Sequence, residues 1–133
     1  MPNRKAHQEA GAKAGALIAL VGNLVEQAKR KNINPQYCFN VGELAAMGML
    51  GYMGGAVGGI LPDLLEPAVH PGHRNVCHSL TAGGLLVAGA NKVHSNPTLH
   101  PCLKTVASAV TAGYASHLIL DGQTPNGIPI FLR

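Results

Sequence analysis

The chain is 133 residues long, carries a formal net charge of +4, and is 47% hydrophobic but only 4% aromatic, with no Trp. This length corresponds to one domain, residues 1–133, which can bury a core without disulfides. The small apolar residues favour closely packed helices over a sheet filled with large rings. So few rings also argue against stacking on single-stranded nucleic acid, although other nucleic acids are not excluded as partners.

Two helices are predicted in the first half of the chain. Apolar residues recur at helical spacing over residues 4–30, and a basic segment followed by Asn and Pro ends that helix. A second helix is predicted over about residues 41–61, with Asn40 as its N-cap and Glu43 as the capping-box partner. We therefore expect Asp63 just past the end of this helix.

Two further helices are predicted after a loop rich in Pro and Gly. The third covers about residues 75–94 and the fourth about residues 103–120, and the tail from residue 121 is rich in turn-forming residues. No segment has the two-residue period of a strand. The sequence therefore predicts an all-α fold, a compact bundle of four to five helices.

The acidic residues are few and lie close to histidines. The chain has six acidic residues, and after residue 44 only Asp63, Glu66 and Asp121 remain. His73 and His78 follow the first two in sequence, and His117 precedes the third. Because imidazole and carboxylate groups are ligands of divalent cations, this pattern predicts a metal site between the helices of the bundle.

His117 and Asp121 are four residues apart on the predicted fourth helix, so both side chains project from one face. A pair at this spacing can chelate one divalent cation, or it can be an ordinary polar pair at a helix end. The residues from 106 to 120 are otherwise nearly all apolar or small. A buried polar pair needs partners, and this context favours a metal.

The segments around the start of the third helix offer further candidates. If that helix begins near residue 75, His73 lies on the entering loop and His78 one turn inside, where the rings can converge. They can equally be exposed histidines of a loop. The hydroxyl of Ser79 can support a ligand. Asp63 is either a ligand or a turn residue, and Glu66 is either a ligand, a base or a capping partner.

The remaining histidines differ in their surroundings. His7 lies on the first helix beside two glycines spaced four residues apart, which let another helix approach, so we expect its face to be packed inward. His70 lies in a Pro-flanked loop, and His94 and His100 have no carboxylate nearby. We interpret these three as surface residues.

Residues 44–62 contain no charge over nineteen residues, which is long enough to span a bilayer. They are rich in glycine, which we interpret as helix packing and which weakens a helix by roughly 1 kcal/mol per residue relative to Ala. We therefore expect a soluble or peripheral protein with this helix buried, and keep a membrane-integral protein as an alternative. Three cysteines without a Cys-x-x-Cys motif, and no visible signal peptide, fit a reducing, cytoplasmic location.

Basic residues gather early in the chain, at Arg4, Lys5, Lys13 and residues 29–31. They form either a solvated surface or a surface that attracts an anion, such as a phosphate ester, a lipid head group or nucleic acid.

The order of these motifs resembles a known family. The chain has His7, then Leu61-Pro62-Asp63, then His73-Arg74 followed by His78-Ser79, then His117 and Asp121, then Thr124 and Gly127. In this order it resembles the LexA-binding, inner-membrane-associated, metal-dependent hydrolases, whose members are distantly similar to zinc-dependent phospholipase C. The resemblance spans nearly the whole chain and implies an all-α fold and hydrolysis with a divalent metal. By match to these motifs, the metal ligands are His7, Asp63, His73, His78, His117 and Asp121.

Residues and resemblance together predict a metal-dependent hydrolase of a phosphoester, either a phosphodiester or a phospholipid-like substrate, attacked by metal-activated water. We expect one or two zinc ions, with manganese or another transition metal as alternatives. Glu66 is assigned as the general base and Arg74 as the group that holds an anionic phosphate. The alternative is a non-enzymatic, metal-stabilised regulatory protein that contacts a repressor or the membrane. The resemblance also implies a place on or in the inner membrane, and the oligomeric state stays open.

Overall fold

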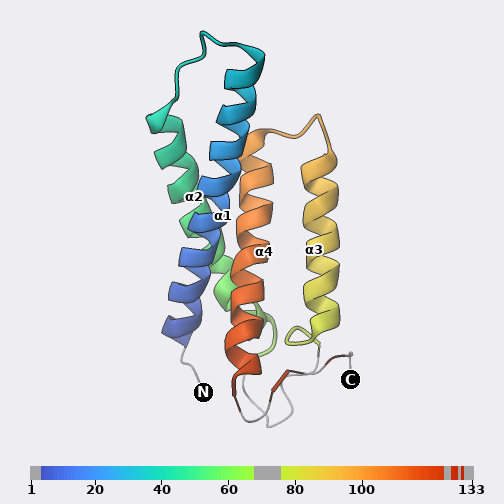
Figure 1. Ribbon diagram of the computed structural model, residues 1–133. Coiled ribbons are helices and arrows are strands. Elements are labelled where there is room, and N and C mark those ends of the chain that lie inside the picture. The colour runs from blue at the N-terminus through green and yellow to red at the C-terminus, as the bar shows by residue number, and fades with distance from the viewer. Residues whose placement is uncertain (1–3, 68–75, 125–126, 129, 131–133) are drawn as a thin grey trace.

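The computed structural model describes residues 4–67, 76–124, 127–128 and 130, and these residues form four helices (Figure 1). The helices are α1 (Arg4–Ile33), α2 (Val41–Leu65), α3 (Leu80–Ser95) and α4 (Pro101–Gly122). No strand occurs within the described ranges. The predicted all-α helical bundle is confirmed.

Three of the helices form the packed body of the molecule, and α3 stands at its side. α1 packs against α2 and α4, α2 also packs against α4, and α3 packs against α4 alone. The start of α1, the end of α2, the start of α3 and the end of α4 all lie at one end of the molecule, the lower end in Figure 1. Residues that are distant in sequence therefore meet at that end.

Glycines make the contacts among α1, α2 and α4. The buried residues of α2 are five glycines and a proline: Gly51, Gly54, Gly55, Gly58, Gly59 and Pro62. A Cβ added to Gly55 would overlap the backbone of Gly11 and Gly15 on α1. A Cβ added to Gly113 on α4 would overlap the carbonyl group of Gly55. The three helix backbones are therefore in direct contact, which only residues without a side chain permit.

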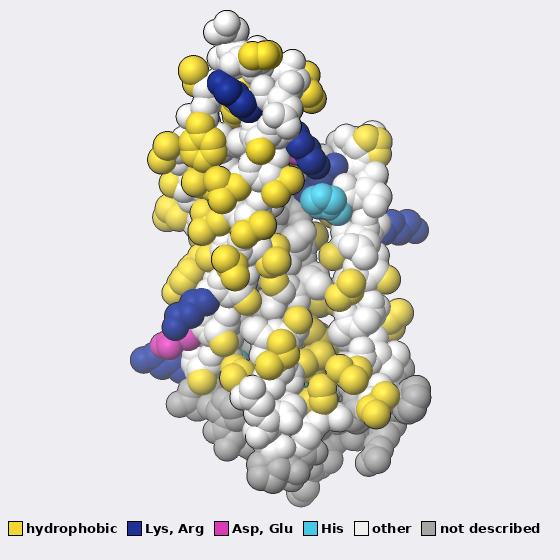
Figure 2. All heavy atoms as spheres, viewed as in Figure 1, with side chains coloured by type: hydrophobic (Ala, Val, Ile, Leu, Met, Phe, Trp, Pro, Cys, Tyr) yellow, Lys and Arg dark blue, Asp and Glu magenta, His cyan; other side chains and the backbone are white. Residues whose placement is uncertain are grey.

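The large apolar residues of α2 lie on the outside instead. Met49, Met53 and Val57 are 70%, 67% and 53% exposed, and hydrophobic side chains cover much of the face shown in Figure 2. Only 28% of the most apolar stretch of α2 is buried, and among the described helices α2 alone is long and apolar enough to cross a membrane. The expectation of a buried central helix is corrected, because α2 buries its glycines and exposes its large side chains.

Helix α2 is also longer than predicted. It runs to Leu65 with Pro62 inside its last turns, so Asp63 lies within the helix and not just past its end. The nitrogen of Pro62 cannot donate, but its carbonyl oxygen accepts a hydrogen bond from the backbone N–H of Glu66 at 2.8 Å. The proline therefore sits close enough to the end of the helix for the last turn to form beyond it.

The later helices differ from prediction at their ends. α3 begins at Leu80 and not near residue 75, because Ser79 is its N-cap and accepts a hydrogen bond from a backbone N–H of the first turn. His78 therefore lies in the turn before α3 and not one turn inside it. α4 extends beyond the predicted residues 103–120 at both ends, so Asp121 lies inside the helix.

Polar side chains join α1 to the start of α2 at the other end of the molecule. Asn40 is the N-cap of α2, as predicted, and accepts a hydrogen bond from the backbone N–H of Glu43 at 2.9 Å. Glu43 does not complete a capping box, because its carboxylate binds the guanidinium of Arg30 at 2.9 and 3.1 Å. The backbone N–H of Asn40 donates to Gln27, which is 1% exposed. These bonds hold the turn between the two helices in one conformation.

Gly55→Ala should destabilise the bundle, because the added methyl group overlaps the backbone of α1 and the helices must separate. We expect a loss of about 1–3 kcal/mol, the usual cost of overpacking, measured as a lower melting temperature by circular dichroism. Gly89→Ala is the matched control, since a Cβ there meets nothing within 4 Å. It should be neutral or stabilise by up to roughly 1 kcal/mol, and equal melting temperatures for the two variants would contradict glycine-mediated packing.

Candidate metal centre

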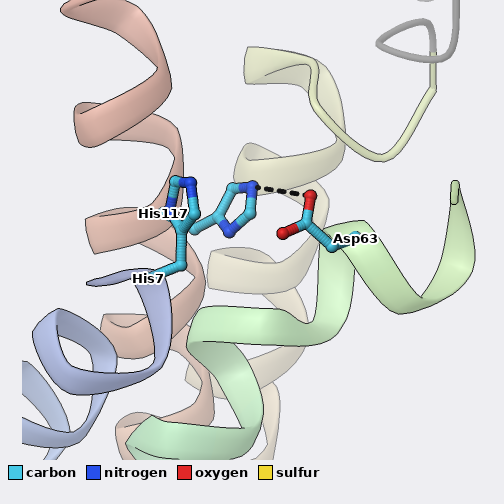
Figure 3. A group of neighbouring side chains, drawn as sticks. All are labelled: His7, Asp63 and His117. Atoms are coloured by element: carbon cyan, nitrogen blue, oxygen red, sulfur yellow. Dashed lines mark ion pairs between the residues drawn. The ribbon is translucent and has the colours of Figure 1, made fainter. Parts of the chain in front are cut away.

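Five potential metal ligands meet at the end of the bundle where α1 and α3 begin and α2 and α4 end. They are His7 from α1, Asp63 from α2, His78 from the turn before α3, and His117 and Asp121 from α4. Figure 3 shows three of them, His7, Asp63 and His117, approaching one another from three helices. The structure thus brings together five of the six residues that the sequence predicted as ligands.

Helix geometry and glycine packing place these side chains. His117 and Asp121 are one turn apart on α4 and face the same way, as their spacing predicted. His7 lies at the contact between α1 and α2. A Cβ added to Gly59 of α2 would overlap the carbonyl oxygen of His7. Asp63 follows that contact by one turn of α2, so its carboxylate reaches the same region.

The ligand atoms form two groups that share His117. One group is His7, Asp63 and His117, the other is His78, His117 and Asp121, and within each group the candidate ligand atoms lie within 4.8 Å of one another. The two oxygens of Asp121 lie 3.5 Å from Nε2 of His7 and 3.4 Å from Nε2 of His117. Oδ1 of Asp63 lies 3.2 Å from Nε2 of His78 and 3.7 Å from Nε2 of His117. The two carboxylates therefore connect three imidazole rings.

The environment of His117 requires a positive charge. Its Nδ1 atom lies 2.7 Å from the carbonyl oxygen of Gly59, which can only accept, so Nδ1 carries the hydrogen and Nε2 of the neutral ring carries a lone pair. That Nε2 atom is buried, with no hydrogen-bond partner among the described residues. It faces carboxylate oxygens of Asp63 and Asp121, which also only accept. A proton or a metal ion at Nε2 makes this arrangement attractive.

Protonation of all three imidazole rings does not stabilise the cluster. The rings of His7 and His117 are stacked, with centroids 3.9 Å apart, and the ring centroid of His78 lies 5.1 Å from that of His117. Imidazolium cations this close repel one another. A single proton at Nε2 of His117 is attracted by both carboxylates, which lie 3.7 Å (Asp63) and 3.4 Å (Asp121) away. A divalent metal ion held by these residues would take the place of that proton and supply one cation between neutral imidazoles and carboxylates.

Glu66 holds His78 in place. Its carboxylate accepts hydrogen bonds from the backbone N–H groups of Val76 at 2.9 Å and Cys77 at 2.7 Å, and lies 3.3 Å from Nδ1 of His78. Burial raises the pKa of Glu66, but these hydrogen bonds outweigh it and lower the pKa overall, so the carboxyl group is ionised at neutral pH. Its contacts are those of a group that orients a metal-ligating histidine, and its assignment as the general base stays a prediction.

The other residues that the sequence analysis named either lie away from the cluster or are not among the described residues. His70, His73 and Arg74 lie outside the described residues, so the roles of His73 as a ligand and Arg74 as a phosphate-binding group stay predictions. The supporting role predicted for Ser79 is corrected. Its hydroxyl donates to the carbonyl of Val76 at 2.7 Å and caps α3.

The five clustered residues suit a small divalent cation. The side chains of His78 and Asp121 are 0% and 2% exposed, and that of His7 is 4% exposed. Charged groups buried without compensation cost on the order of several kcal/mol each. Imidazole nitrogens and carboxylate oxygens are donors that zinc and manganese accept. The side chain of Asp63 is 33% exposed, so the cluster is open to solvent on its side.

The fold and this cluster define an all-α bundle with a buried histidine–carboxylate centre and an apolar exterior. Residues 5–132 match the YdjM inner membrane protein family, and because this match covers nearly the whole chain, the chain belongs to that family. No curated protein and no solved structure matches the chain. The family and the apolar helix α2 together support association with the membrane, as the resemblance implied.

The purified protein should contain at least one divalent metal ion per chain, and His117→Ala should lose it, because His117 belongs to both ligand groups. We expect the affinity to fall by more than the roughly 10–100-fold that loss of an outer partner costs. Plasma mass spectrometry after gel filtration measures the metal content. His94→Ala, at an exposed position, is the control, and wild-type metal content in His117→Ala would contradict the assignment.

Glu66→Gln should weaken metal binding by about 10–100-fold without abolishing it. The amide keeps an oxygen acceptor for one of the two backbone N–H groups, places its NH2 group against the other, and removes the negative charge beside His78. Competition with a chromogenic chelator measures the affinity. Glu9→Gln, whose side chain is 55% exposed on α1, should bind metal as the wild type does. An unchanged affinity in Glu66→Gln would rule out the orienting role.

Proposed function

We propose that this protein is a metal-dependent hydrolase that acts on a phosphoester. The observation that carries the proposal is the buried Nε2 atom of His117, which faces two carboxylates while Nδ1 is held by Gly59. The residues that would hold the cation are His7, Asp63, His78, His117 and Asp121. One or two zinc ions suit these donors, and manganese or another transition metal is an alternative.

In this proposal the chain's own residues position the cation and the substrate. When bound, a divalent cation supplies a Lewis acid that activates water and polarises the phosphoryl group. Glu66 fixes the ring of His78 so that Nε2 faces Asp63. Asp63 has the most exposed side chain of the five ligands, at 33%, and lies where a substrate can enter. In this proposal Glu66 also remains the candidate general base, and Arg74 holds the phosphate by a forked contact.

An apolar cavity near the cluster favours a substrate with a hydrocarbon part. The cavity lies between α3 and α4 and has a volume of about 310 Å³. Its lining includes Leu80, Tyr114 and Leu118. Leu80 follows the turn that carries His78, and Leu118 follows His117 in α4. A phospholipid-like phosphoester could place its chain in this cavity, and an anionic small molecule is the alternative substrate.

The apolar exterior favours a protein embedded in the inner membrane over one attached to its surface. Besides the exposed methionines of α2, Leu17 and Val21 of α1 are 61% and 49% exposed. Large apolar surfaces of this kind are unfavourable in water, and they match the lipid-facing exterior of helices that pack through small residues.

The protein should stay in the membrane fraction after washes with high salt and alkaline carbonate, and should need detergent for extraction. Such washes remove proteins held by charge, whereas an embedded apolar exterior keeps its contact with lipid. Immunoblotting of the fractions measures the distribution, with a known peripheral protein as the control. Release by salt alone would show a peripheral protein and contradict embedding.

Hydrolysis of a phosphodiester or phosphomonoester reporter should be abolished by a chelator and restored by added zinc or manganese. Asp63→Ala should abolish it without unfolding the protein, because it removes one carboxylate at the solvent side of the cluster. Product release is followed by absorbance, and circular dichroism checks the fold. Glu9→Gln should keep full activity. Activity that survives the chelator or the Asp63 substitution would contradict the proposal.

The alternative is a metal-stabilised regulatory protein without catalysis, which contacts a repressor or the membrane. The near-complete burial of His78, His117 and Asp121 favours it, because structural metal sites are closed. In this case Asp63→Ala should lower the melting temperature of the metal-loaded protein, and no reporter should be hydrolysed by the wild type. The two functions thus differ in whether the metal-loaded wild type turns over a substrate.

A further inference from the structure

A second cavity lies at the end of the bundle away from the candidate metal centre. It lies between the second half of α1, the start of α2, the end of α3 and the first turns of α4, and has a volume of about 510 Å³. In Figure 2, Lys, Arg and His side chains lie in the upper part of the molecule, above a mainly hydrophobic middle, and a second group of Lys or Arg side chains lies at the lower left. The cavity combines both kinds of lining, basic and apolar.

The acidic side chains of this cavity are already bound by one arginine. Arg30 binds Glu43 at 2.9 Å and lies 3.7 Å from Glu26. The remaining charged residues of the lining are Lys29 and Lys104, and neither side chain forms a hydrogen bond or ion pair within the described part of the chain. Two acidic and three basic residues leave the lining with a net positive charge.

Lys104 and Ser108 point to an anion between them and α1. They are one turn apart on α4, so both can contact one group. Lys104 is half-buried, and an ammonium group has three donors and no acceptor. The hydroxyl of Ser108 has no hydrogen bond to any described residue. In contrast, Thr111 and Ser116 on the same helix bond a backbone carbonyl of the preceding turn. The cavity therefore holds donors that the described residues do not satisfy.

The apolar part of the cavity runs along α1 towards the middle of the bundle. Ile18, Val21 and Val25 line it, and all three are 46% to 49% exposed. Lys29 lies 11 residues beyond Ile18, which corresponds to roughly 16 Å along a helix. A ligand that fills the cavity thus meets donors at one end and hydrocarbon surface along its length.

The donors lie where the uncharged parts of two helices end. No Lys, Arg, Asp or Glu occurs over residues 14–25 of α1 or residues 105–120 of α4, and Lys29 and Lys104 lie beyond these runs at the same end. In a protein of an inner membrane family, basic side chains beyond uncharged stretches of helix can contact lipid phosphates.

We propose that this cavity binds an anionic phospholipid, with its phosphate held by Lys29, Lys104 and Ser108 and an acyl chain along Ile18, Val21 and Val25. The site is separate from the candidate metal centre and needs no catalysis. Basic pockets between membrane helices bind anionic head groups by the same chemistry.

The purified full-length protein in neutral detergent tests this proposal, with its melting temperature measured against added phosphatidylglycerol, phosphatidylcholine or inorganic phosphate. Phosphatidylglycerol should raise the melting temperature in a saturable way, and phosphatidylcholine should not. The double variant Lys29→Gln/Lys104→Gln should weaken this effect by about 10-fold or more, the order expected for two lysines near an anionic lipid. Lys5→Gln/Lys13→Gln makes the same charge change at the other end of α1 and should behave as the wild type.

Gly22→Leu tests the contact with the acyl chain without changing any charged residue. Gly22 lines the cavity, and a Cβ there meets nothing within 4 Å, so the larger side chain can enter the cavity without moving the backbone. This variant should fold and should also lose the stabilisation. Equal stabilisation of the wild type and the Lys29→Gln/Lys104→Gln variant would overturn the site. Stabilisation by inorganic phosphate alone would overturn the assignment to a lipid.

Discussion

Direct backbone contact between α1, α2 and α4 determines the rest of this structure. Gly55 lies against Gly11 and Gly15 on one side and against Gly113 on the other, with no side chain between the helices. Two consequences follow from this close approach. The first turns of α1 lie beside the last turns of α2 and α4, which brings the candidate metal ligands together at one end. The large apolar side chains are left on the outside, which fits the membrane association that the family indicates.

The same contacts build the candidate metal centre. Gly59 lies against the backbone of His7, and its carbonyl oxygen accepts the hydrogen of His117 Nδ1. The packing of α2 therefore sets which nitrogen of His117 faces Asp63 and Asp121. Because that nitrogen faces only acceptors, the cluster is complete when it holds a positive charge. Gly59 therefore links the fold to the candidate metal centre, because its lack of a side chain permits the contact with the backbone of His7.

Sequence patterns predicted the features that depend on residues within one or two turns. The spacing of His117 and Asp121 and the cap at Asn40 are of this kind, and the structure agrees with both. Contacts between distant segments have no such pattern. Glu66 reaches the turn before α3 only because α2 continues past Pro62, and Gly59 meets His117 only when the helices pack. The exposure of large residues on α2 could not be predicted either, because it depends on which face the partner helices cover.

X-ray absorption at the metal edge of the purified protein tests the central claim most directly, because it identifies the atoms around the ion. The account predicts nitrogen and oxygen neighbours at about 2.0–2.2 Å and scattering from at least two imidazole rings, with a smaller imidazole contribution in His78→Ala. A spectrum with sulfur neighbours, or one without imidazole, would contradict the account.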